Sequence, residues 1–100
     1  MDGWTALADP TRRSIFELVA ARPRAVGEIA RQVDVTRPAV SQHLKLLKSA
    51  RLVIDQAEGT RRIYRVDQSG LRELRQQLDR FWNQSLANFK ALVEQPEEEG

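Results

Sequence analysis

The sequence contains no cysteine, and His43 is the single histidine among its 100 residues. Without thiols, neither a disulfide framework nor a cysteine-ligated metal site can form. One imidazole with no thiolate and no second imidazole cannot build a tetrahedral zinc site, so we expect no metal and no other cofactor. The same scarcity argues against an enzyme, because His43 and Ser41 on one helix would point about 200° apart and could not form a catalytic dyad.

Long apolar runs are also missing. No run approaches the roughly 20 residues that span a bilayer, and the N-terminus has no basic stretch ahead of an apolar core. These absences disfavour membrane insertion and secretion and predict a cytoplasmic protein. With 41% hydrophobic residues, the chain can build one small core. We therefore expect one folded domain over residues 1–93 and a disordered acidic tail over residues 94–100, where a run of glutamates has nothing to bury.

Charge is present but unevenly placed. The net charge is only +2, yet residues 12–65 hold twelve basic and five acidic side chains, a balance of +7. From residue 66 onward four basic side chains face seven acidic ones, a balance of −3. This separation indicates a middle segment that binds a polyanion. The alternative is an ordinary solvated surface, and the charge count alone does not separate the two.

Residues 36–48 form the most informative segment. In a helix over this segment, the apolar residues Val40, Leu44 and Leu47 fall on one side. The opposite side carries Pro38, Gln42, Lys45 and Ser49. The hydroxyl of Thr36 can cap the helix, and a proline in the first turn costs little there. The segment therefore predicts a helix with one buried side and one side that contacts a polar partner.

Two helices are expected before this one. Asp9 can cap a helix over about residues 10–21, with proline at its first position. A short helix over about residues 26–33 then ends at Asp34, a residue type that tolerates the left-handed conformation. A small residue, a bend and an apolar residue at this spacing fit the tight crossing of a helix-turn-helix: Ala30, Asp34 and Val40. Helical hairpins of similar spacing also occur in proteins that do not bind nucleic acid.

Downstream, the pattern becomes extended. Apolar residues 52–54, a polar loop over 58–60 with a glycine, and residues 61–66 predict a two-stranded hairpin. Arg61 and Arg62 fall beside its tip. A hairpin this small must pack on the helices, so its tip projects as a wing that can reach phosphates or a minor groove. The alternative is an ordinary hairpin whose arginines serve solubility.

The order and spacing of these features resemble the ArsR-type winged helix-turn-helix regulators over roughly residues 5–92. The resemblance rests on ALADPTRR at 6–13, on VSQHLKLL at 40–47 followed by Leu52-Val53, and on a wing that starts at Glu58-Gly59 and ends in IYRV at 63–66. It implies a mainly α fold with a small β-hairpin (α+β), dimeric through its N- and C-terminal helices. It also implies a transcriptional regulator and autoregulation. We expect repression by default, because a dimer this small has little spare surface for contacting polymerase.

Two features depart from the family pattern. Many relatives have glycine just before the first wing strand, where this chain has Arg51. A left-handed arginine there would carry roughly 1 kcal/mol or more of strain. Metal-responsive members carry cysteine pairs near the first helix of the helix-turn-helix, or histidine and acidic ligands on the last helix. This sequence has neither set, which is a second reason to expect no metal.

The last helix, expected over about residues 69–93, is too long for a domain this small unless part of it packs outside its own subunit. Its apolar stripe is Leu71, Leu74, Leu78, Phe81 or Trp82, Leu86, Phe89 and Val93. Some of these residues must enter the monomer core, which also takes Ile15, Leu18, Leu44 and Leu47. We therefore expect a homodimer whose interface includes Trp4, Leu7, Leu78, Trp82 and Phe89.

These elements predict how double-stranded DNA would be bound. A two-fold dimer would place two copies of helix 36–48 in successive major grooves, reading an inverted repeat with half-sites roughly 10 base pairs apart. Gln42 and Ser41 are the candidates for base edges, and Arg37 and Lys45 for guanine or phosphate. Contacts to the backbone are expected from Thr36, His43, Arg61 and Arg62. The alternative function is a winged-helix protein–protein interaction module without specific DNA binding.

Overall fold

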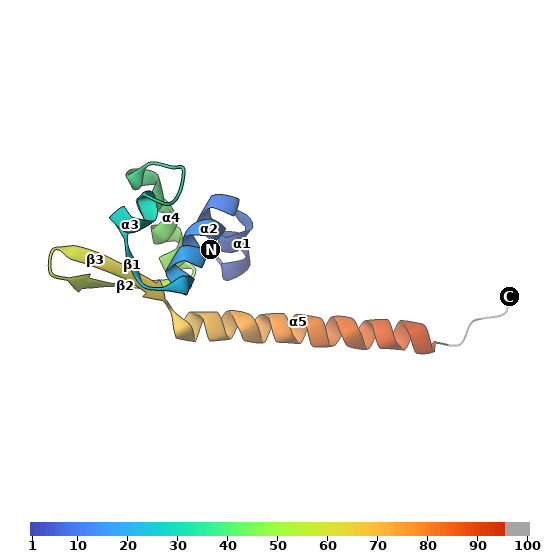
Figure 1. Cartoon of the computed structure of the whole chain (residues 1–100). Helices are drawn as coiled ribbons and strands as arrows, with labels where there is room; N and C mark the ends of the chain where they lie inside the picture. Colours follow the sequence, from blue (N-terminus) through green and yellow to red (C-terminus); the bar gives the residue numbers. More distant parts are fainter. Residues whose placement is uncertain (96–100) are drawn as a thin grey trace.

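The computed structural model describes residues 1–95, which form five helices and three strands (Figure 1). The helices are α1 (Gly3–Ala8), α2 (Pro10–Ala21), α3 (Val26–Ala30), α4 (Arg37–Ser49) and α5 (Gln68–Glu94). The strands are β1 (Arg24–Ala25), β2 (Val53–Glu58) and β3 (Arg61–Val66). This order confirms the expected winged helix-turn-helix architecture. In Figure 1, α5 leaves the globular part as a long straight rod.

Four side chains begin helices as the sequence pattern requires. Asp9 accepts a hydrogen bond from the N–H of Arg12 at 2.8 Å, and the Thr36 hydroxyl accepts one from Ala39 at 3.3 Å. Both caps confirm the prediction. Asp2 and Asp67 do the same for α1 and α5. Each cap satisfies a backbone donor that the first helical turn leaves free.

The core lies where α1, α2, α3, α4 and the start of the wing meet. Val40, Leu44 and Leu47 of α4 are fully buried, as predicted. They belong to a cluster with Ala6, Ile15, Val19, Ile29, Leu52 and Val53. Because one side of α4 is buried in the core, its opposite side faces solvent.

The wing is larger than predicted. Strand β2 runs to Glu58, so Gly59 and Thr60 alone form the turn, and Gly59 has the left-handed φ of 62° that this turn requires. The sheet has three strands in the order β1-β3-β2, because Arg24 pairs with Tyr64 and Ala25 with Ile63. The prediction of a two-stranded hairpin was therefore incomplete. The added pairing ties the chain just before α3 to the wing.

Two local predictions in the N-terminal half need correction. A separate helix α1 over residues 3–8, for which the sequence pattern gave no bounds, precedes both positions. Helix α3 ends at Ala30 and not near residue 33. The backbone turns and bends over residues 31–35, and Val33 and Val35 both pack against the core. Asp34 is not left-handed, since Arg51 is the one non-glycine residue with positive φ in the described chain.

The joint between α4 and α5 is built on that arginine. Arg51 has a φ of 63°, which confirms the suspected left-handed conformation. Its carbonyl oxygen lies against α5 at Gly70, where an added Cβ would come within 1.7 Å of it. The Arg51 side chain pairs with Glu73 in the next turn. Close approach of backbone to helix therefore requires glycine at position 70 and an unusual backbone at position 51.

Helix α5 is slightly longer than the expected range of 69–93. Its last residue is Glu94. The predicted disordered tail over 94–100 is therefore wrong at its first position, which is helical. The other tail residues from 96 to 100 lie outside the described part of the chain. Within residues 1–95, no helix is both long and apolar enough to cross a membrane.

Candidate nucleic-acid interface

The exposed side of α4 carries most of the predicted DNA-contacting residues. Arg37, Ser41, Gln42 and Lys45 are all exposed, as is the cap residue Thr36. Gln42 and Lys45 lie on the side opposite the buried Val40, Leu44 and Leu47, whereas Arg37 and Ser41 lie between the two sides. The arrangement is a rigid helix, anchored along one side, with amide, hydroxyl and cationic groups free on the other. Such groups match the hydrogen-bonding edges of bases and the charge of phosphates.

His43 sits differently. It is half-buried, and its Nδ1 is buried with no hydrogen-bond partner among the described residues. Nearby Asp9 has a pKa below its ordinary value, chiefly because the N–H of Arg12 binds its carboxylate, with the charges of Arg12 and His43 acting in the same direction. A phosphate contact through His43 would therefore have to use the other ring nitrogen, and that contact stays a prediction.

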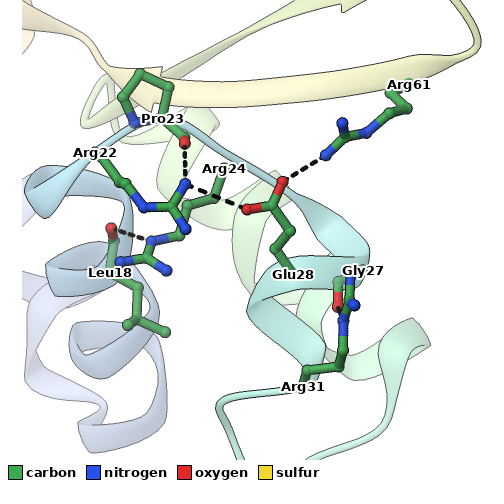
Figure 2. A network of polar contacts seen from close by, with 8 residues as sticks. All are labelled: Leu18, Arg22, Pro23, Arg24, Gly27, Glu28, Arg31 and Arg61. Carbon is green, nitrogen blue, oxygen red and sulfur yellow. Dashed lines mark hydrogen bonds and ion pairs between the residues drawn. The ribbon is translucent and has the colours of Figure 1, made fainter.

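Arg61, at the start of β3, is held against α3. Its guanidinium donates to Oε1 of Glu28, while Arg22 donates to Oε2 of the same carboxylate at 3.3 Å (Figure 2). Partial burial alone would raise the pKa of Glu28, but the Ala25 N–H and the charges of Arg61 and Arg22 lower it overall. The sequence pattern did not reveal this network, because its members lie 6 and 33 residues from Glu28.

Arg62 belongs to a second network on the other side of the wing. It donates to Asp55 at 2.8 Å, and Lys48 at the end of α4 binds the same carboxylate at 2.7 Å. The Asp55 side chain is only 8% exposed. The hydrogen bond from Lys48 chiefly lowers the pKa of Asp55, and Arg62 adds to this against the effect of burial. Arg61 thus ties the wing to α3, whereas Arg62 ties β3 to β2 within the wing and Lys48 joins the same carboxylate to α4.

A basic pocket lies between α3, the start of α4 and the wing. Its volume is about 610 Å³, and its lining comprises Ala25, Val26, Gly27, Glu28, Arg31, Arg37, Thr60, Arg61 and Arg62. Arg31 is anchored by a hydrogen bond from its Nε to the Gly27 carbonyl at 3.1 Å. Sequence reasoning missed Arg31 as a site residue, although it was counted in the basic middle segment. The structure thus brings Arg37, Arg61 and Arg62 together and adds a fourth arginine.

The predicted interface residues lie along α1 and α5. Trp82 and Phe89 are 54% and 64% exposed, and Trp4 is also exposed, whereas Leu7 and Leu78 are half-buried. Trp4 donates from its indole N–H to Gln77 at 3.1 Å, which holds α1 beside α5. Four other large apolar residues of α5 are also exposed: Phe81, Leu86, Leu92 and Val93. Single exposed apolar residues are common on protein surfaces, but a series of them along one helix is typical of an interaction site.

No cluster of three or more histidine, cysteine, aspartate or glutamate side chains suited to a metal ion occurs among residues 1–95.

The described residues form two distinct surfaces. One is the basic surface formed by α4, α3 and the wing, and the other is the apolar surface along α5.

Comparison with known proteins identifies the kind of regulator. A family model described as a helix-turn-helix domain matches residues 7–56. The HTH-type transcriptional regulator Rv2034 from Mycobacterium tuberculosis is 57% identical over 91 residues, 91% of this chain and 85% of that protein. A crystal structure of a possible transcriptional regulator for arsenical resistance has a TM-score of 0.76 at 34% identity, covering 97% of this chain and 99% of that one.

A second solved structure adds the assembly state of a relative. The solution NMR structure of the homodimeric winged helix-turn-helix DNA-binding domain of Mb0332 from Mycobacterium bovis, a possible ArsR-family regulator, has a TM-score of 0.62 at 28% identity. The match covers 97% of this chain and 83% of that one. With the family match and the 57% identical relative, these similarities show that the chain belongs to the ArsR-type winged helix-turn-helix transcriptional regulators.

Proposed function

We propose that the protein is a homodimeric repressor that binds an inverted-repeat operator in double-stranded DNA. The observation that carries this proposal is α4, whose apolar side is fully buried while its polar side stands exposed beside the arginine-lined wing. A helix anchored in this way can enter a major groove without disturbing the core. The relatives are transcriptional regulators, which supports a regulatory role and not an enzymatic one.

The side chains of α4 divide by chemistry. Gln42 can pair bidentately with adenine, and Ser41 can adapt to several bases. Arg37 and Lys45 carry charges that suit guanine or phosphate. Contacts that set the register on the backbone are assigned to Thr36, His43, Arg61 and Arg62.

The dimer would form along α5. Its exposed aromatic residues, with Trp4 of α1, are the large apolar surface that a second copy can cover, and the homodimeric state of Mb0332 supports this arrangement. A two-fold pair would present α4 twice, at half-sites about one helical turn apart. Trp82→Ala and Phe89→Asp should therefore lower the mass measured by sedimentation. An unchanged mass would remove these residues from the interface.

Repression is the simplest outcome of binding. Repression needs no surface beyond those that bind DNA and the partner copy, because a dimer on the operator would act by occupying it. Access to DNA also requires the cytoplasmic location expected from the sequence. A transcription assay with the selected operator would distinguish repression from activation by the sign of the change.

The proposal is tested by measuring affinity for a cognate and a scrambled duplex across a salt series. A cognate site can be selected from a random pool. Gln42→Ala should cost roughly 1–3 kcal/mol on the cognate duplex and little on the scrambled one. Arg61→Ala should weaken both and flatten the salt slope by about one unit. Gln76→Ala, an exposed glutamine on α5, is the matched control and should change neither.

Two outcomes would contradict this assignment. Equal weakening of both duplexes by Gln42→Ala would mean that the exposed side of α4 does not read bases. Weak and salt-independent binding of the wild-type protein to any duplex would instead indicate a winged-helix module that binds another protein.

A further inference from the structure

Glu28 is the one acidic residue among the residues that line the basic pocket, and the wing is fastened to it. Its side chain is 24% exposed and lies on α3, facing the start of β3. Each carboxylate oxygen has its own arginine: Oε1 binds Arg61 of the wing and Oε2 binds Arg22 after α2 (Figure 2). In the free protein, the arginine nearest the turn of the wing is therefore already paired.

A carboxylate and a phosphate present the same chemistry to an arginine. Both offer anionic oxygens that the planar guanidinium binds through parallel N–H donors. The position of Glu28 among Arg31, Arg37 and Arg61 is thus one that a DNA phosphate would also favour. A carboxylate fixed there repels an approaching phosphate and occupies one of its ligands.

We propose that Glu28 competes with a DNA backbone phosphate for Arg61, so that DNA binding exchanges the Arg61–Glu28 pair for an Arg61–phosphate pair in this pocket. This inference rests on the proposed DNA-binding function. It assigns Glu28 as a residue that limits affinity, and it makes the pocket between α3 and the wing the site of one specific phosphate.

The two carboxylates that bind the wing arginines differ in how readily they can release an arginine. Glu28 retains Arg22 at 3.3 Å when Arg61 leaves, so its charge is not left unpaired. The Arg61 side chain is largely exposed and can reorient without opening the core. Asp55 is more deeply buried and holds Arg62 together with Lys48 of α4. Arg62, which is as exposed as Arg61, can contact DNA while it keeps its pair with the more buried Asp55, and Arg61 is the arginine that exchanges its carboxylate for phosphate.

The test is a double-mutant cycle on DNA affinity. Glu28→Gln should tighten binding to both cognate and scrambled duplexes by roughly three- to tenfold at low salt, because an exposed ion pair no longer has to be broken. Glu17→Gln makes the same change in net charge from an exposed position on α2 and is the matched control. It should give a smaller gain. In an Arg61→Gln background, the gain from Glu28→Gln should fall to that of the control.

Two results would overturn the exchange. Weaker binding by Glu28→Gln would mean that Glu28 holds Arg61 in the orientation that DNA needs. An equal gain with and without Arg61 would mean that only net charge matters. Glu28→Asp keeps the charge while shortening the reach to Arg61, and it should give an intermediate gain; no gain from this variant, with its fold verified by circular dichroism, would also count against the exchange.

Failure of the proposed function gives a different result. If the wild-type protein binds no duplex in dilute salt, DNA binding itself is wrong and the exchange falls with it. If the wild-type protein binds and Glu28→Gln does not differ from Glu17→Gln, only the exchange is wrong.

Discussion

Helices α4 and α5 have the same kind of amphipathic sequence, but they end up in opposite environments. The apolar stripe of α4 is completely buried within its own chain. Along α5 the stripe is half-buried up to Leu78, and Leu86 and Phe89 beyond it are 58% and 64% exposed. Helix α5 of 27 residues is about 40 Å long, which exceeds what the small core can cover.

The difference shows what an amphipathic pattern does and does not specify. Periodicity identifies which side of a helix is apolar, because that depends on 3.6 residues per turn alone. It does not identify what covers that side. For α4 the cover is α2, α3 and the wing of the same chain, whereas for the second half of α5 no cover exists within residues 1–95.

A leucine-to-alanine substitution in each helix should show the largest difference between α4 and α5 in the free energy of unfolding. Leu44→Ala removes a fully buried side chain and should lower the free energy of unfolding by about 2–5 kcal/mol at every protein concentration. Leu86→Ala removes an exposed side chain, and within one chain it should cost less than about 0.5 kcal/mol. In a dimer, Leu86→Ala should instead weaken the association of the two copies. Urea unfolding at two protein concentrations measures both.

The comparison would break if Leu86→Ala destabilised the protein equally at low and high concentration. That result would place the partner of Leu86 within its own chain. The contrast between α4 and α5 would be supported if the loss from Leu86→Ala, relative to wild type, changed with protein concentration while the loss from Leu44→Ala stayed the same.

Much of the fold followed from the sequence because its signals are local. The caps at Asp9 and Thr36, the buried side of α4 and the hairpin turn at Gly59 each depend on residues close together in the chain. What escaped prediction depends on contacts between distant segments. Strand β1 has two residues and no pattern of its own, and it exists because Arg24 and Ala25 pair with β3.

The candidate site divides in the same way. The exposed side of α4 was predictable, since burial of one side fixes the other. The partner of Arg61 was not, because Glu28 meets it only after the wing has packed on α3, and the partner of Arg62 depends on the strand register that brings Asp55 close to it. Nothing in the spacing of Arg61 and Arg62 indicated that they would bind different carboxylates.

The joint between the two helices offers a smaller test. Arg51 holds a left-handed backbone conformation that costs an L-residue with a side chain about 1 kcal/mol or more. Its ion pair with Glu73 is exposed and contributes little. Arg51→Gly should therefore raise the free energy of unfolding by up to about 1 kcal/mol, measured by urea denaturation. Arg65→Gly, exposed within strand β3, is the contrasting control and should destabilise.

A destabilising Arg51→Gly would show that the side chain contributes more than its backbone strain costs. The joint would then be held by the Arg51–Glu73 pair, and α5 would be fixed to the domain more firmly by charge than by the close approach of Gly70.

The smallest expected effect concerns how α4 is tied to the wing. Asp55 has a pKa lowered chiefly by Lys48 of α4, so its charged form stabilises the folded state. A group with a lowered folded pKa contributes its stability above its unfolded value, near 3.9 for aspartate, and loses it as the pH falls through the folded pKa. The difference in unfolding free energy between wild type and Asp55→Asn should thus be largest above about pH 5 and shrink toward pH 3. Urea titrations at each pH measure it, and a difference that stays constant over this range would mean that Asp55 stabilises the joint through packing and neutral hydrogen bonds alone.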